Sequence, residues 1–155
     1  MSGWTLIIGS SLPDLSEDQN TPNSITSHVL SLSQVFGEVQ YFGNHRIVGY
    51  YAWMKAMDGE VTRAFAYLGE RGEILVNEGA LTKNEQELQL VYRETDSEAN
   101  EDETRFPDEE DVLAIAKAWG VDPMMEGEGY SPGTGYVGRF HILVNGTKVH
   151  RSRRP

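Results

Sequence analysis

The dipeptide Asp58-Gly59 constrains the fold of this chain most, because it separates two runs of alternating aromatic and small residues. A two-residue type I′ turn needs positive φ at both central positions, and Asp-Gly is suited to that conformation. We therefore predict a β-hairpin. The expected register pairs Ala56 with Val61, Met54 with Arg63, Ala52 with Phe65, Tyr50 with Tyr67, Lys55 with Thr62, Trp53 with Ala64 and Tyr51 with Ala66.

Further strands are expected on both sides of this hairpin. The Gly-Glu-Arg-Gly turn at residues 69–72 leads to a predicted strand over 73–77, and residues 38–42 are expected to form a fourth strand. The sheet, centred on residues 46–77, is then an antiparallel meander. The apolar run Trp4–Ile8 predicts a short buried strand, and further strands are expected at residues 88–92 and 139–144, the last followed by a turn at Asn145-Gly146.

Apolar residues at helical spacing predict helices over residues 24–36 and 108–119. The first is expected to begin at Asn23 or Ser24 and to end at Gly37, with a buried stripe of Ile25, Val29, Leu32 and Phe36. The second is expected to begin at Asp108 and to end at Gly120. A capping-box pattern, Thr82 with Glu85, predicts a short helix over residues 83–88.

The predicted fold class is therefore α+β: an antiparallel β-meander sheet with two or three helices packed on it. Residues 1–155 are expected to form one domain, with Trp53, Phe65 and Trp119 in its core. The chain has no cysteine, so neither a disulfide nor a thiolate metal site is expected. His28, at the edge of the first helical stripe, is interpreted as a packing residue.

The net charge is −11, which disfavours nucleic acid and anionic membranes and favours basic partners. Residues 94–111 hold ten acidic residues against one arginine, a net charge of −9. The loop at about residues 94–107 is expected to be mobile, and a basic tail ends the chain. The N-terminus lacks the basic segment of a signal peptide and no apolar run is long enough to span a membrane, so a cytoplasmic location is expected.

Two glycine-containing motifs suggest chemistry, but the surrounding residues argue against it. Residues 129–133 match the G-x-S-x-G nucleophile elbow, yet Pro132 has no N–H for an oxyanion hole. Residues 133–138 match G-x-G-x-x-G, but a strand rather than a helix is expected to follow. The loop over residues 127–138 is interpreted as flexible, with a modest role in admitting a ligand left open. No cofactor and no metal are expected, since the four histidines lack ligand spacing.

Several segments resemble a family of small acidic bacterial proteins that has no established activity. They are Gly37 to Phe42, His45-Arg46, Tyr51 to Trp53, Asp58-Gly59, Arg63 to Glu73, Glu78-Gly79 and Phe106 to Val112. The resemblance covers about residues 37–120 and implies a bacterial, stand-alone, cytosolic protein, without implying a reaction.

The leading functional hypothesis is a binding module, an immunity or neutralising protein that masks a basic toxin or enzyme domain. The expected partner-binding residues are Glu101, Asp102, Glu103, Asp108, Glu109, Glu110 and Asp111. The acidic run alternatively serves only solubility, in a regulatory domain of unknown ligand. A further alternative is a metal-independent hydrolase that uses His45 with Glu70, Glu73 or Glu78.

Overall fold

The computed structural model describes residues 3–16, 24–90, 105–125 and 136, and the backbone alone of residues 142–144 and 147–149. Its elements in chain order are α1 (Ile25–Phe36), β1 (Glu38–His45), β2 (Tyr50–Met57), β3 (Glu60–Leu68), β4 (Glu73–Glu78), α2 (Lys83–Leu88), α3 (Glu109–Trp119), β5 (Ile142–Val144) and β6 (Thr147–Val149). The predicted α+β class is confirmed. None of the helices in these ranges has the length and apolar character needed to cross a membrane.

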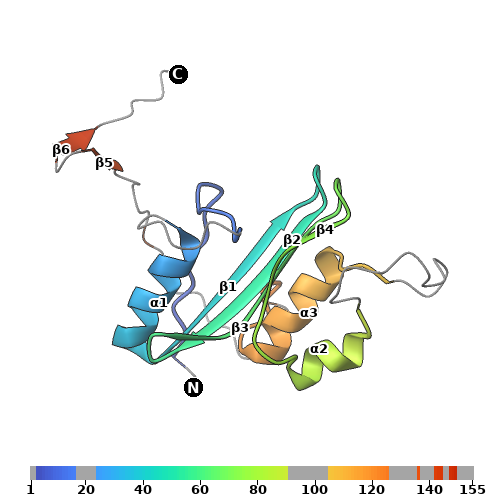
Figure 1. Cartoon of the computed structure of the whole chain (residues 1–155). Coiled ribbons are helices and arrows are strands. Elements are labelled where there is room, and N and C mark those ends of the chain that lie inside the picture. Colours follow the sequence, from blue (N-terminus) through green and yellow to red (C-terminus); the bar gives the residue numbers. More distant parts are fainter. Residues whose placement is uncertain are drawn as a thin grey trace.

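Strands β1 to β4 form one antiparallel sheet in the order β1-β2-β3-β4, as the meander prediction requires. Helix α1 packs on one face of this sheet, whereas α2 and α3 lie on the other (Figure 1). The described domain is therefore a three-layer arrangement with two separate apolar cores, one on each face of the sheet. Among the described strands, β5 and β6 pair only with each other.

The hairpin turn forms where it was predicted, and both central residues have positive φ, 50° at Asp58 and 89° at Gly59. The pair Ala56 and Val61 is also confirmed. The remaining register was wrong by one residue, because a β-bulge inserts Thr62 into β3. The Thr62 hydroxyl donates a hydrogen bond to the Lys55 carbonyl, 3.0 Å away, at this bulge.

The bulge decides which side chains share a face. Each later residue of β3 faces a different partner from the one predicted, so that Trp53 pairs with Phe65 instead of Ala64. A shift of one residue moves side chains to the opposite face of a sheet. Phe65 therefore lies on the α3 side, with its ring centroid 4.8 Å from that of Trp53. Alanines are left on the α1 side, at positions 52, 56, 64 and 66.

Helix α1 begins at the Ser24 cap and ends at Gly37 as predicted, but its buried stripe differs. Ile25 and Val29 are buried, whereas Leu32 and Phe36 are 36% and 72% exposed. Ser33 is buried in their place. Its hydroxyl accepts a hydrogen bond from the Gly59 N–H, at 2.9 Å, so the helix turns a polar residue toward the hairpin.

The predicted strand at Trp4–Ile8 was wrong. These residues have no regular structure, and Ile7 and Ile8 are 68% and 88% exposed. Leu15 reaches the core instead, held by hydrogen bonds between its backbone and the Tyr50 hydroxyl.

The other predicted strands meet mixed outcomes. Helix α2 ends at Leu88, and residues 89–90 after it do not form the predicted strand. Residues 91–92 lie outside the described ranges. Backbone pairing of β5 with β6 agrees with a hairpin after residue 144, although its turn lies outside the described ranges. The loop over 127–138, apart from Tyr136, and the tail beyond residue 149 also lie outside the described ranges.

Two of the three predicted core aromatics, Trp53 and Phe65, are fully buried. Trp119 is only partly buried, with its ring centroid 5.8 Å from that of Phe42 and the Lys55 ammonium 5.5 Å from its centre.

We predict that Phe65→Ala lowers the free energy of unfolding by about 3–5 kcal/mol, because it leaves a cavity beside Trp53. Urea unfolding followed by tryptophan fluorescence measures this loss. Val35→Ala, at a site that is 72% exposed, is the control and should change stability by less than about 0.5 kcal/mol. Equal losses for the two variants would contradict the assignment of Phe65 to the core.

Candidate functional site

The predicted partner-binding residues divide into two groups. Glu101, Asp102 and Glu103 lie outside the described residues. Asp108, Glu109, Glu110 and Asp111 form the cap and the first turn of α3.

A reciprocal capping box fixes this turn. The Asp108 carboxylate accepts a hydrogen bond from the Asp111 N–H, and the Asp111 carboxylate accepts one from the Asp108 N–H, each at 3.0 Å.

Asp111 is buried and bonded within the domain. It is 2% exposed, and the Arg105 guanidinium donates a hydrogen bond to its carboxylate at 2.7 Å. Burial raises the pKa of the Asp111 carboxyl, and the hydrogen bonds from Asp108 and Arg105 offset only part of that effect. Of the four acids at the start of α3, Asp108, Glu109 and Glu110 remain accessible to a partner.

Glu109 forms an ion pair with Arg46, which lies in the turn after β1. The Arg46 side chain is 76% exposed, and an exposed pair of this kind contributes only about 0–1 kcal/mol. The contact therefore orients Glu109 more than it stabilises the fold. Asp108 and Glu110 are exposed, and no described Lys or Arg forms an ion pair with either of them.

This imbalance extends over the described part of the chain. All seven of its Lys and Arg side chains form an ion pair with a carboxylate. It has fourteen carboxylates, so seven have no described Lys or Arg as an ion-pair partner: Asp14, Asp58, Glu60, Glu70, Glu78, Asp108 and Glu110. The internal ion pairs thus use every described cation and leave excess negative charge at the surface.

Two residues that were not among the predicted site residues, Arg105 and Phe106, hold the segment before α3. Arg105 donates to the Leu88 carbonyl at 2.8 Å, in addition to its contact with Asp111. Phe106 stacks on Tyr67, with ring centroids 5.2 Å apart and planes inclined by 13°. The described end of the predicted mobile loop therefore packs against the α3 side of the sheet.

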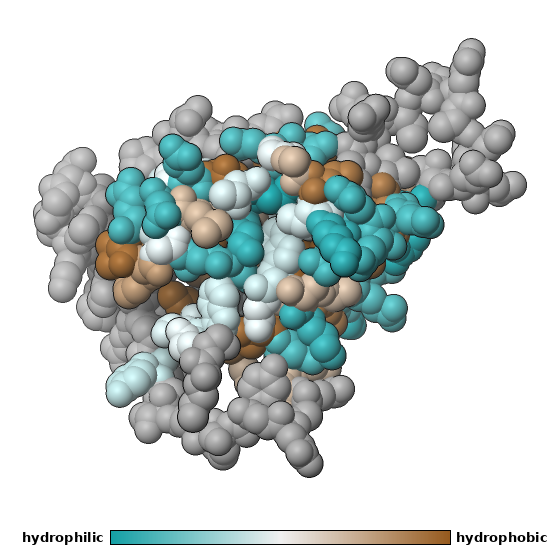
Figure 2. All heavy atoms as spheres, turned by 90° about the horizontal axis from the view of Figure 1, so that it is seen from below, coloured by the Kyte–Doolittle hydropathy of each residue, from teal (hydrophilic) through white to brown (hydrophobic). Residues whose placement is uncertain are grey.

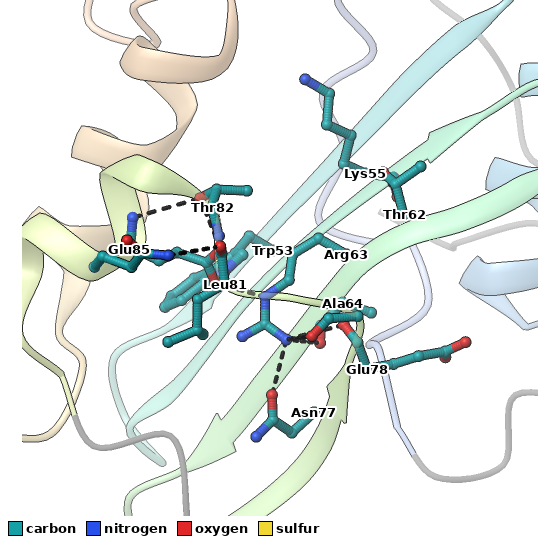
Figure 3. A network of polar contacts seen from close by, with 12 residues as sticks. Trp53, Lys55, Thr62, Arg63, Ala64, Asn77, Glu78, Leu81, Thr82 and Glu85 are labelled. Carbon is teal, nitrogen blue, oxygen red and sulfur yellow. Dashed lines mark hydrogen bonds and ion pairs between the residues drawn. The ribbon is translucent and has the colours of Figure 1, made fainter.

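A buried ion pair joins α2 to the sheet. Arg63 on β3 and Glu85 on α2 are 1% and 0% exposed, and the Arg63 Nε lies 2.7 Å from the Glu85 Oε1 (Figure 3). The Trp53 indole N–H donates to the same oxygen at 2.8 Å. The other Glu85 oxygen accepts from the backbone N–H and the hydroxyl of Thr82, at 2.8 and 2.7 Å. One carboxylate therefore caps its own helix and anchors that helix to the sheet.

The remaining contacts of Arg63 are directed toward β4. Its Nη1 donates to the Asn77 side-chain oxygen at 2.8 Å and to the Glu78 carbonyl at 2.9 Å (Figure 3). Gly79, next along the chain, has φ of 81°, and a Cβ there would lie 2.3 Å from the Thr62 carbonyl oxygen. A side chain at position 79 would therefore clash with the strand beside this network.

The residues of the alternative hydrolase hypothesis are widely spaced. His45 is exposed at the end of β1, and three strand spacings, about 14 Å, separate its backbone from that of Glu73. Glu78 pairs with Ala64, toward the opposite end of the sheet. Glu70 comes nearest, because its N–H donates to the Val48 carbonyl at 3.0 Å, in the turn after His45. In the described ranges no three His, Asp or Glu side chains are placed to hold a metal ion.

Comparison with known proteins gives no relative: no family model matches the chain, and neither a curated protein nor a solved structure is significantly similar to it.

We predict that Glu85→Gln lowers the free energy of unfolding by about 3–5 kcal/mol, because it leaves the Arg63 charge buried without its counter-ion. Adding Arg63→Met should restore part of the loss. Urea unfolding of both variants measures the difference. A double variant less stable than Glu85→Gln would show that the carbonyl contacts of Arg63 outweigh its ion pair.

A second prediction concerns Tyr50, whose hydroxyl bonds to the backbone of Leu15. Burial, with Tyr41 nearby, raises the pKa of Tyr50 above its ordinary value. Its stabilising contribution is therefore complete below the unfolded pKa, about 10, and is lost as the pH rises further. We expect the stability of Tyr50→Phe to fall less steeply with rising pH above 10 than that of the unchanged protein, as measured by circular dichroism. Tyr136→Phe, which removes a hydroxyl group at a 93% exposed position, is the matched control.

Proposed function

We propose that this protein is a cytoplasmic binding protein that masks a basic partner, as an immunity or neutralising protein does, with the start of α3 as one contact surface. The observation that carries the proposal is the excess of carboxylates over cations in the described residues. Since every described Lys and Arg already has a carboxylate partner, the exposed acids are not neutralised by these internal cations. A basic partner supplies the missing counter-charges.

The start of α3 suits this role because its backbone is fixed before binding. The capping box and the Arg105 contact hold the turn, so its exposed acids lose little conformational entropy when a partner binds. Its negative charge also lies at the positive end of the helix dipole, which stabilises the turn. This order favours a binding role over one in solubility alone, because a segment that only keeps the protein soluble does not need a fixed backbone.

The partner can be sought by capture from a lysate of the source organism at low salt, followed by binding kinetics with each purified basic protein. We expect the double variant Asp108→Asn, Glu110→Gln to weaken binding on the order of tenfold, chiefly through a slower association rate. Its dependence on salt should also be shallower. Asparagine keeps the N-cap, and Asp111 is left in place because it is buried.

The matched control is Glu70→Gln, Glu78→Gln, which removes two carboxylates that also have no described cation as a partner. This control should change the affinity much less than the α3 variant. Retention of only acidic or neutral proteins at low salt would contradict the proposed function. Equal affinity of the unchanged protein and the α3 variant would contradict the assignment of this surface.

A further inference from the structure

Helix α1 has an exposed apolar side that the packing of the domain does not use. Its twelve residues include no Lys, Arg, Asp or Glu. Leu32, Val35 and Phe36 occupy positions i, i+3 and i+4, so they are neighbours on one side of the helix. Val35 and Phe36 are each 72% exposed, and Leu32 is 36% exposed. A surface helix ordinarily places polar residues on this side, and a contiguous apolar patch indicates an interaction site.

The hairpin turn between β2 and β3 fixes the end of α1. The Asp58 N–H donates to the Gly37 carbonyl at 2.8 Å, and the Gly59 N–H donates to the Ser33 hydroxyl at 2.9 Å. Gly59 also lies against Gln34, since a Cβ on Gly59 would be 2.6 Å from the Gln34 Cγ. The end of α1 that carries Val35 and Phe36 is therefore held in place by the turn, which reduces the entropy that binding would cost.

This end of the molecule is also negative. The carbonyl end of a helix carries a partial negative charge, and the last turn of α1 has no basic residue to balance it. Asp58 and Glu60, in and after the adjoining turn, form no ion pair with a described cation. The last turn of α3, by contrast, has Lys117. Figure 2 views the molecule from this end and shows hydrophobic residues exposed among hydrophilic ones.

We propose that Leu32, Val35, Phe36, Asp58 and Glu60, here called the α1 face, form a docking surface for a partner segment that is both apolar and basic. Leucine or aromatic side chains of the partner cover the apolar residues, and its Lys or Arg side chains reach the two carboxylates and the helix carbonyl end. This inference rests on the proposed function and adds to it the chemistry of the partner. A second copy of this chain fits poorly, because its net charge of −11 repels the same surface.

The α1 face and the start of α3 are separate surfaces. α1 and α3 cover opposite faces of the sheet, and the turn that Glu109 contacts is at the other end of β2 from Asp58 (Figure 1). Strand β2 has eight residues, so the two turns are about 25 Å apart along it. That separation exceeds the screening length of about 8 Å at physiological salt. Variants at one surface should therefore leave local binding at the other unchanged.

The test uses two fluorescently labelled probes of equal charge, an amphipathic lysine–leucine peptide and an oligolysine, with binding followed by anisotropy. We expect the unchanged protein to bind the lysine–leucine peptide more tightly. Val35→Ser, Phe36→Ser should weaken this binding at least tenfold, while oligolysine binding stays the same. Asp58→Asn, Glu60→Gln should weaken both, and asparagine tolerates the positive φ at position 58. The control Ile47→Ser, at an 89% exposed apolar residue in the turn after β1, should change neither.

The outcomes separate the two proposals. If Val35→Ser, Phe36→Ser binds the lysine–leucine peptide as tightly as the unchanged protein, the α1 face is not the docking surface, whereas the proposed function stands if the α3 variant still weakens binding. If the unchanged protein binds neither probe, the inference is wrong, whereas the proposed function is decided by the capture at low salt. A dimer in light scattering that this α1 variant converts to a monomer would identify a second copy as the occupant and overturn the inference. An unchanged urea midpoint confirms that the variant is folded.

Discussion

The buried ion pair between Arg63 and Glu85 is the contact on which the α2–α3 side of this domain depends. Removing two charges from water costs several kcal/mol, so such a pair is tolerated only when hydrogen bonds satisfy the remaining polar atoms. Here Trp53 and Thr82 donate further hydrogen bonds to the Glu85 carboxylate, and backbone carbonyls around β4 accept hydrogen bonds from Arg63. The pair thereby joins β3, β4 and α2 in one network.

This network continues to the proposed binding surface. The carbonyl of Leu88, the last residue of α2, accepts from Arg105, and Arg105 pairs with the Asp111 carboxylate that caps α3. Arg105 contacts both elements, at 2.8 Å to Leu88 and 2.7 Å to the buried Asp111, so α2 and the start of α3 are positioned together. The order that makes the exposed acids of α3 suitable for binding therefore originates in the interior of the domain.

The two proposed surfaces differ in physical character. The start of α3 offers charge with little apolar area, which raises association rates more than it raises affinity. The α1 face combines exposed apolar side chains with two carboxylates, and in interfaces with apolar anchors a few residues contribute most of the binding energy. A basic partner attracted by the overall charge and anchored on α1 would use both properties.

The sequence by itself determined the local elements: the Asp58-Gly59 turn, the caps at Ser24, Thr82 and Asp108, and the α+β class, because short-range backbone and capping preferences fix these. Only the tertiary structure decided which face each β3 residue occupies, because the pairing of β2 with β3 inserts Thr62 as a bulge and shifts the register by one residue. It also decided that Ser33 is buried in place of Phe36, because the group that bonds to Ser33, the Gly59 N–H, is distant along the chain. The burial of Asp111 likewise became apparent only in the folded domain.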